Sequence, residues 1–471
     1  MPIYIYNSLT RKKEELLPLS SGRLKIYTCG VTVYDECHIG HARSLYVFEV
    51  IRRYLKHRGF KVKFVRNITD IDDKIINRSK ELKIGWKELA KKYIVRYYQD
   101  LLALGIQKAD YEPRATENIP SMIKFIANLI AKGYAYATQT GVYFRVRNFT
   151  EYGKLSGQSI DQMLTGTRKE PDETKDDPLD FALWKISRPG EPSWRSPWGP
   201  GRPGWHIECS VMSSRFLKTE TLDIHAGGRD LIFPHHENEL AQSEAASGKP
   251  FARYWLHHGL LTINGQKMAK SLGNFITIQD FLRQYRDGDL LKLFFLGTHY
   301  AHPVDYNEDK IREAIKQKNV FLDFLNAVNT WPLGIDKKPV AFSEQDRSKI
   351  ENICTKFQEA LDDDFNTPLA LGYLFELVDL GQGFKSADKK DAFRYLKSKL
   401  ESFFSIFGIT MLADIKIPKA VNKKIKEMQE ARKAGEFDRS DSIREELRTD
   451  GYAASNTASS VTITLVRQEN K

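Results

Sequence analysis

The chain has 471 residues, of which 41% are hydrophobic and 28% charged, a composition typical of a globular protein with about three domains. No apolar run approaches the roughly 18 residues of a membrane span, and the first residues lack the apolar core of a signal peptide, so we expect a cytoplasmic protein without a membrane segment. The formal charge of +11 favours a polyanionic partner without identifying one, and four cysteines are too few for a disulfide framework in a chain of this length.

The N-terminal part, residues 1–110, predicts alternating strands and helices. Residues 23–35 predict a strand followed by a loop, and apolar residues between Leu45 and Leu55 then recur at helical spacing. Residues 60–76 repeat this unit with a second strand and a second helix. A strand, a helix and a strand within about fifty residues indicate a βαβ unit and therefore a parallel sheet.

The rest of the chain predicts four further segments. Residues 111–204 are rich in Pro, Gly and charge towards their end and predict an insertion between two halves of the sheet domain, which resumes over 205–300. Residues 301–410 have helical periodicity throughout and predict a bundle. Residues 411–471 predict two charged helices, a turn at Asp450-Gly451 and a strand. The expected fold is therefore α/β with an insertion, followed by an α-helical bundle and a small C-terminal module.

Two histidines, His38 and His41, flank Ile39-Gly40 at the start of the first expected helix. A helix N-terminus presents unpaired N–H groups and a positive dipole, and imidazoles beside it can donate hydrogen bonds to phosphate oxygens. Glycine between them lets a ligand approach the backbone. Taken alone, the pattern also fits two ordinary surface or core histidines.

A second candidate for phosphate binding is the segment 264–274, which carries Lys267 and Lys270 between Gly265 and Gly273. Lysines on such a loop can neutralise charge that develops on a polyphosphate, although most lysine pairs are simply solvated. The chain contains no G-x-x-x-x-G-K-[ST] sequence, which excludes a P-loop as the nucleotide site.

Four residues predict a metal site: Cys29, Cys209, His235 and Glu239. The last two are four positions apart and would share one face of a helix. With two thiols they form a plausible zinc shell, although a lone buried cysteine is more often inert. We expect His236 to point off this face and to have no metal role. The absence of H-E-x-x-H counts against a metalloprotease.

These motifs carry a resemblance to a known family. His38-Ile39-Gly40-His41, followed by Lys267-Met268-Ala269-Lys270-Ser271, resembles the paired motifs of class I aminoacyl-tRNA synthetases. With "RNITDIDDKII", "LDFALWK", "PGWHIECS", "FPHHENE" and "LDDDFNTPLAL", the chain is similar to the cysteinyl-tRNA synthetase family over nearly its whole length. The resemblance implies a Rossmann-like catalytic domain and one Zn²⁺ per chain on Cys29, Cys209, His235 and Glu239, where the metal takes the thiolate of the substrate cysteine.

The resemblance also implies a reaction in two steps. The carboxylate of L-cysteine attacks the α-phosphate of ATP, with His38 and His41 at the phosphorus and Lys267 and Lys270 at the departing pyrophosphate, together with Mg²⁺. The 2′-hydroxyl of the terminal adenosine of tRNA(Cys) then takes the cysteinyl group and AMP is released. The expected nucleotide contacts are Gly40, His38, His41, Lys267, Lys270 and Ser271, and the expected cysteine contacts are Gly30, Thr69, Trp205, His206 and Asp230.

Because zinc distinguishes a thiol from a hydroxyl, the inserted segment 111–204 is not expected to be an editing domain. Two departures from the family pattern stand out: Ala269 replaces a serine, and the C-terminus lacks a Gly-Thr-x-Trp ending, which leaves anticodon contacts there open. Two alternatives remain, namely a ligase that joins cysteine to the amine of an amino sugar, and a non-catalytic RNA-binding module. We expect a monomer.

Overall fold

The computed structural model describes residues 1–159, 174–327, 341–410, 419–449, 452–456 and 461–465. The chain divides into two compact units. The first contains Met1–Leu261, Tyr300–Val304 and Asp362–Phe365, and the second contains Thr262–His299, Asp305–Leu361 and Asn366–Lys471. No helix among the described residues is long and apolar enough to cross a bilayer.

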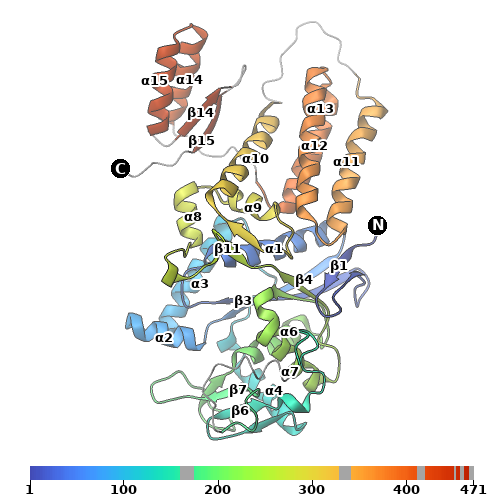
Figure 1. Cartoon of the computed structure of the whole chain (residues 1–471), viewed down its shortest axis with the longest axis vertical. Coiled ribbons are helices and arrows are strands. Elements are labelled where there is room, and N and C mark those ends of the chain that lie inside the picture. The colour runs from blue at the N-terminus through green and yellow to red at the C-terminus, as the bar shows by residue number, and fades with distance from the viewer. Residues whose placement is uncertain (160–173, 328–340, 411–418, 450–451, 457–460, 466–471) are drawn as a thin grey trace. The chain divides into compact units, whose positions relative to one another are not determined.

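A parallel sheet forms the centre of the first unit. Its strands have the order β10-β9-β3-β4, with β3 at Arg23–Thr32, β4 at Lys61–Thr69, β9 at Leu222–Gly228 and β10 at Ala252–His258. All neighbouring strands pair in parallel. The α/β fold and the parallel sheet predicted from the βαβ pattern are therefore confirmed, and the two halves expected from sequence contribute two strands each (Figure 1).

The helix α1 (Ile39–His57) connects β3 to β4. The residues that predicted its helical periodicity, from Leu45 to Leu55, form its buried face. Three further helices of this unit position the site: α6 (Trp205–Leu217), the short η4 (Ile232–His236) and α7 (Glu237–Ser247). Because α6 precedes β9 and α7 precedes β10 in the chain, both are crossover helices of the parallel sheet.

The described part of the insertion has its own antiparallel sheet, β5-β6-β7-β8. Its apolar residues share a core with α6, since Leu129, Phe144 and Trp184 cluster with Met212. The remaining elements of the first unit are β1 (Tyr4–Asn7), β2 (Lys12–Glu15), α2 (Asp73–Leu82), α3 (Trp86–Ala103), η1 (Ala115–Glu117), α4 (Ile119–Ala131), β5 (Ala135–Ala137), β6 (Gly141–Phe144), η2 (Val146–Asn148), β7 (Phe181–Ile186), β8 (Gly201–Pro203) and η3 (Arg229–Leu231).

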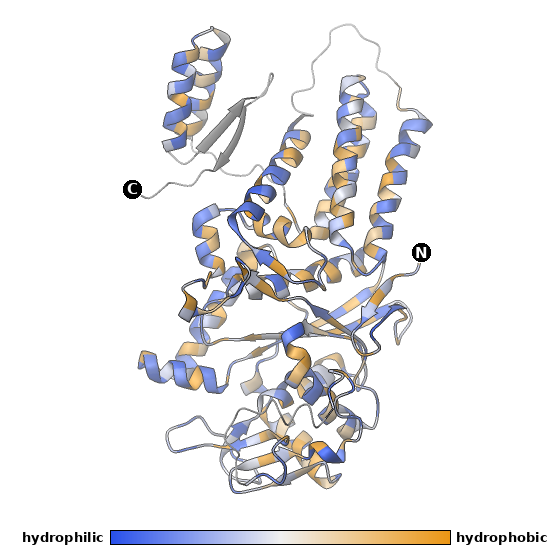
Figure 2. Ribbon diagram, viewed as in Figure 1, coloured by the Kyte–Doolittle hydropathy of each residue, from blue (hydrophilic) through white to orange (hydrophobic). Residues whose placement is uncertain are grey.

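The second unit is mainly helical, as predicted. Phe321, Phe357, Leu374 and Phe404 are buried on four of its helices, and each helix also carries polar residues, as the mixed colours of α12 and α13 in Figure 2 show. The elements are β11 (Leu261–Ile263), whose first residue belongs to the first unit, β12 (Gln266–Lys267), η5 (Lys270–Leu272), α8 (Ile278–Tyr285), α9 (Gly288–Leu296), β13 (Val304–Tyr306), which also begins in the first unit, α10 (Glu308–Ala327), α11 (Glu344–Asp362), α12 (Thr367–Ser386), α13 (Lys390–Phe407), α14 (Lys419–Lys433) and α15 (Phe437–Thr449).

The C-terminal module differs from expectation in one respect. Instead of one strand, the chain forms an antiparallel hairpin of β14 (Tyr452–Asn456) and β15 (Val461–Leu465). The sequence indicates only one strand because Val461, Ile463 and Leu465 alternate with polar residues, whereas the small and polar residues of Tyr452–Asn456 give little strand signal. The expected turn at Asp450-Gly451 lies outside the described residues.

An irregularity in β3 directs a side chain into the site. The register of β3 against β4 shifts between Thr28 and Val31, so Cys29 and Gly30 lie in a bulge. Gly30 approaches β4 so closely that a Cβ atom there would lie 1.6 Å from the carbonyl oxygen of Asn67. The N–H of Gly30 donates to Asn67 Oδ1 over 2.8 Å. Glycine is therefore required at this position for packing, whatever ligand the site binds.

This close approach predicts the effect of Gly30→Ala. The added methyl group must push β3 away from β4, so we expect the thermal unfolding midpoint to fall by at least about 4 °C, measured by circular dichroism. Gly85→Ala is the control, because a Cβ atom at Gly85 meets nothing within 4 Å. Equal midpoints for the two variants would show that the bulge tolerates a side chain.

Candidate metal and nucleotide site

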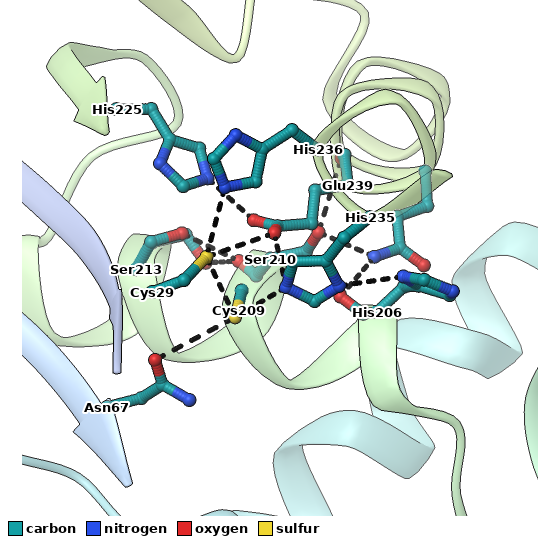
Figure 3. A network of polar contacts seen from close by, with 12 residues as sticks. Cys29, Asn67, His206, Cys209, Ser210, Ser213, His225, His235, His236 and Glu239 are labelled. Carbon is teal, nitrogen blue, oxygen red and sulfur yellow. Dashed lines mark hydrogen bonds and ion pairs between the residues drawn. The ribbon is translucent and has the colours of Figure 1, made fainter. Parts of the chain in front are cut away.

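Four side chains from four different elements meet at one end of the parallel sheet. Cys29 comes from the bulge of β3, Cys209 from α6, His235 from η4 and Glu239 from the first turn of α7 (Figure 3). The crevice outside the carboxyl ends of parallel strands is the usual ligand site of such sheets. The structure thus brings together all four predicted metal ligands, within the first unit.

The separations of these donor atoms fit a small tetrahedral cation. Cys29 Sγ lies 3.7 Å from Cys209 Sγ and 3.3 Å from Glu239 Oε1, and Cys209 Sγ lies 3.6 Å from His235 Nε2. Ligands at zinc bond lengths of about 2.0–2.3 Å have tetrahedral edges of about 3.3–3.8 Å. The fourth distance, 2.8 Å between His235 Nε2 and Glu239 Oε1, is that of a direct ion pair. Two sulfurs, one nitrogen and one oxygen are also a donor set that suits zinc.

Two further histidines, not assigned to the site from sequence, reach the same cluster. His236 Nε2 lies 3.3 Å from Cys29 Sγ, so the expectation that this side chain points away is wrong. Adjacent residues of a helix differ by only about 100° in direction, so His236 reaches Cys29 while His235 reaches Cys209 and Glu239. His225 Nε2 lies 2.7 Å from Glu239 Oε2. Among the described residues, Cys29, His225, His236 and Glu239 therefore form a second, overlapping group with metal-binding geometry.

The ring nitrogens that face away from the cluster also have partners. His235 Nδ1 lies 2.8 Å from His206 Nδ1, and His236 Nδ1 lies 2.8 Å from His257 Nε2. Trp205, which is 38% exposed, stacks on His235 with ring centroids 3.9 Å apart. Such outer contacts fix the tautomer and orientation of a ligating imidazole.

The charges of the cluster compensate one another. Burial would raise the pKa of Cys209, but hydrogen bonds with Cys29 and His235 lower it to about 7. Burial opposes protonation of His235, but the carboxylate of Glu239 raises its pKa to about 10. His225 and His235 hold the pKa of Glu239 well below its usual range against the effect of burial. A divalent cation would therefore replace protons that the site otherwise holds.

The residues expected to contact an amino acid lie around this cluster with partners of their own. Thr69, at the end of β4, donates its hydroxyl to Glu208 Oε2 over 2.7 Å. Glu208 was missed from sequence, since a glutamate on a helix is normally solvated; it is buried, and burial raises its pKa well above the usual value. Asp230 is exposed in η3, and its Oδ1 lies where a Cβ atom on Gly228 would clash.

The histidine motif caps α1. His38 Nδ1 accepts from the N–H groups of Gly40 and His41, over 3.1 Å and 3.3 Å, and His41 Nδ1 accepts from the N–H of His38 over 3.3 Å. The two rings stack with centroids 3.7 Å apart. Since Nδ1 accepts in each ring, a neutral ring carries its proton on Nε2. Burial, His38 and Lys74 lower the pKa of His41 well below its usual value.

The lysine loop belongs to the second unit. Lys267 ends β12 and Lys270 begins η5, and both side chains are exposed, as is Ser271. Asn274 shapes the loop: its Oδ1 accepts from the N–H of Ala269 over 2.8 Å, and its Nδ2 donates to the carbonyl of Lys267 over 3.2 Å. The loop therefore keeps a defined backbone although Ala269 lacks the hydroxyl of the family serine.

Comparisons with known proteins agree with this arrangement. Residues 15–316 match the family model for the catalytic domain of class I (C) tRNA synthetases, and residues 356–412 match a DALR domain. The chain is 48% identical over 472 residues to a cysteine–tRNA ligase of Thermodesulfovibrio yellowstonii, covering 95% of this chain and 96% of that protein. It is 46% identical over 460 residues to a cysteine–tRNA ligase of Caldicellulosiruptor saccharolyticus, covering 96% and 97%.

Solved structures show the same fold at low identity. A Mycobacterium tuberculosis methionyl-tRNA synthetase in complex with methionyl-adenylate matches with a TM-score of 0.61 at 16% identity, over 83% of this chain and 88% of that chain. The ternary complex of Agrobacterium radiobacter K84 LeuRS with tRNA and LeuAMS matches with a TM-score of 0.63 at 11% identity, over 84% and 85%. These likenesses confirm the Rossmann-like class I fold.

The capping geometry predicts the protonation state of His41. Because its pKa is lower in the folded than in the unfolded chain, the unfolded state takes up this proton first as the pH falls, and His41 reduces stability below about pH 6.5. Nitrogen-15 NMR of labelled histidine should show the His41 ring neutral, with its proton on Nε2, down to roughly pH 6. The resonance is assigned by its absence in His41→Gln. Titration near pH 6.5 would contradict the capping account.

Proposed function

Since the chain belongs to the cysteine–tRNA ligase family of class I synthetases, we propose that it activates L-cysteine with ATP on a zinc centre and transfers it to the terminal adenosine of tRNA(Cys). The observation that carries the proposal is the buried group of Cys29, Cys209, His235 and Glu239 at the carboxyl end of the sheet. The products would be cysteinyl-tRNA, AMP and pyrophosphate.

The donor set of the metal site indicates that the substrate carries a thiol. One Zn²⁺ held by these four residues would coordinate a thiolate and prefer sulfur to an alcohol oxygen. Serine and cysteine differ by one atom, from which an organic pocket obtains only about 1–3 kcal/mol of discrimination. The described part of segment 111–204 is accordingly assigned no editing role. His225 supports the metal site by binding Glu239 Oε2, which leaves Oε1 directed at the cluster.

The amino acid itself would be held by side chains around the cluster. The hydroxyl of Thr69 donates to Glu208 and accepts from Asn67 Nδ2 over 3.2 Å, which leaves one lone pair to accept from the substrate ammonium group. Asp230 supplies a negative charge for the same group. Trp205 and His206 would cover the amino acid, and the packing role of Gly30 keeps the backbone of β3 close to it.

The chain's part in the activation step is electrostatic. The proton on Nε2 of His38 and of His41 gives each ring a donor for oxygens on the α-phosphorus, and the N-terminus of α1, which includes Gly40, adds its dipole. Lys267, Lys270 and Ser271 would bind the departing pyrophosphate, with the Mg²⁺ that accompanies ATP. These contributions position groups and neutralise charge, as phosphoryl and adenylyl transfer requires.

The remaining segments support tRNA as the acceptor. The matched cysteine–tRNA ligases are covered over 96–97% of their length, which includes the helical bundle and the DALR match. An enzyme acting on an amino sugar would not require these parts. We assign the bundle and the basic helix α14 to tRNA binding, with the anticodon at the C-terminal module, in a cytoplasmic monomer. A non-catalytic RNA-binding module is disfavoured because the histidine, lysine and metal residues are all retained.

The zinc assignment predicts the metal content of the purified protein. We expect about one Zn²⁺ per chain by elemental mass spectrometry, and Cys209→Ser should lower this sharply because it removes one of two thiolate ligands. Cys354→Ser is the control, since Cys354 lies in α11, on the second unit. Full occupancy in Cys209→Ser, or equal loss in both variants, would rule out the assignment.

The activation step predicts cysteine-dependent exchange between ATP and labelled pyrophosphate. The exchange rate with serine should be more than about 200-fold lower than with cysteine. A pocket that discriminates by shape alone does not achieve a ratio this large. His41→Ala should lower the exchange rate by about 10²–10³-fold, because it removes a donor to the reacting phosphate. Exchange with serine within tenfold of that with cysteine would contradict metal-based selection.

A further inference from the structure

Side chains of α1 and its C-cap form hydrogen bonds with each segment of the first unit at which the chain leaves or re-enters that unit. The passages lie after Leu261 and at both ends of the segments Tyr300–Val304 and Asp362–Phe365, all of which belong to the first unit. The contacts with α1 are therefore contacts within that unit. They lie at both ends of the helix, at Arg43 near its start and at Tyr54 and Arg58 at its end.

At the start of α1, Arg43 binds two of these segments. This residue follows His41 by two positions and is 1% exposed. Its Nη1 donates to the carbonyl of Leu260 over 2.8 Å, and its Nη2 donates to the carbonyls of Tyr300, over 3.3 Å, and His302. Among the described residues Arg43 has no acidic partner, and burial lowers its pKa to about 10.

Burying an arginine without a carboxylate partner costs desolvation free energy, so it contributes little to stability. The planar fork of a guanidinium does, however, hold several carbonyl groups in fixed directions, which a lysine cannot reproduce. The carbonyls that Arg43 holds are already organised by the backbone: Leu260 O also accepts from the N–H of Val304, and Tyr300 O also accepts from the N–H of Gly259. Arg43 thus fixes geometry where the chain leaves the first unit.

At the end of α1, the third segment is bound in the same way. The hydroxyl of Tyr54 donates to Asp362 Oδ1 over 2.6 Å, and Arg58 pairs with the same carboxylate. Asp364 Oδ1 accepts from the hydroxyl of Tyr300 over 2.8 Å, which joins the second segment to the third. Phe365 is buried against the ring of Tyr54, 6.2 Å between centroids.

The turn of this third segment is strained. Asp364 and Phe365 have φ values of 58° and 53°, which cost about 1–3 kcal/mol for residues other than glycine and persist only where the surroundings hold them. The hydrogen bonds above supply that hold. A strained turn that is fixed by buried side chains on both sides keeps one conformation.

We propose that α1 anchors the ends of the first unit at which the chain leaves and re-enters it, and that Arg43 is a positioning residue for cysteine activation. Arg43 fixes Leu260 with respect to His41, and Leu260 precedes Lys267 by seven positions in the sequence. The chain from Leu260 through β11 and β12 therefore starts from a point tied to the histidine motif. The inference rests on the proposed function, since it assigns the two motifs to one nucleotide.

The test is a double-mutant cycle on the rate of cysteine-dependent ATP–pyrophosphate exchange. Arg43→Lys keeps the charge but not the planar fork whose donors point at the three carbonyls in fixed directions, so kcat should fall at least about tenfold while the KM for cysteine stays within about twofold. In the Lys267→Ala/Lys270→Ala background the same substitution should change kcat less than about twofold, because the lysines it positions are absent. Bound zinc should be unchanged.

The matched control is Arg52→Lys. Arg52 lies on the same helix and is 2% exposed, but its partners are the carbonyl of Lys108, Gln107 Oε1 and Glu49, none of which lies in a connecting segment. It should lower the thermal midpoint without lowering kcat at a temperature where the protein is folded. If Arg43→Lys fails to fold, Asp362→Asn takes its place in the cycle with the same expectation.

Each outcome decides the inference. An equal loss from Arg43→Lys in both backgrounds, or a loss that Arg52→Lys matches, would overturn it and leave Arg43 a structural residue. Absence of cysteine-dependent exchange in the unmodified protein would instead overturn the proposed function. Dependence of the Arg43→Lys effect on the two lysines, with Arg52→Lys unaffected, would establish the coupling.

Discussion

The buried charge compensation around Glu239 is the constraint on which the site depends. A carboxylate in a fully buried position costs several kcal/mol unless it is paired and hydrogen-bonded. Here it accepts from His225 on one oxygen and from His235 on the other, and Cys29 Sγ lies 3.3 Å from Oε1, while Cys209 contacts Cys29 and His235. Removing His225 or His235 would leave one oxygen of this buried carboxylate without its hydrogen bond, which destabilises the remaining cluster.

That cluster explains local features that lie far apart in the sequence. The bulge in β3 turns Cys29 towards α6, and the close approach at Gly30 is a consequence of the same bulge. His235 and His236 reach the cluster from adjacent positions, one at Cys209 Sγ and the other at Cys29 Sγ. Contacts of His206 and His257 with the far nitrogens then fix the rings. The parallel sheet determines where the cluster lies, and the bulge in β3 determines the direction in which Cys29 points.

Much of this could be predicted from sequence, but not all. The parallel sheet, the helical bundle and the four residues of the first metal group followed from hydrophobic periodicity, donor chemistry and a family resemblance. His225 could not be found, because a histidine inside the apolar strand β9 gives no pattern that separates it from a core residue. The direction of His236 was misjudged because a residue next to a helix face can still reach a cluster that several elements surround. Likewise, the periodicity around Arg43 predicts a helix but not which carbonyls a buried arginine will bind.

The measurement that tests the account most directly is transfer of labelled cysteine to total tRNA in the presence of ATP, before metal removal, after chelation and after Zn²⁺ is restored. The account predicts cysteine-specific charging that is lost with the metal and recovered with Zn²⁺. Charging that persists in fully metal-free protein would contradict the role of the Cys29–Cys209–His235–Glu239 group. ATP consumption with cysteine but without charged tRNA would contradict the proposed acceptor and point to a small amine in its place.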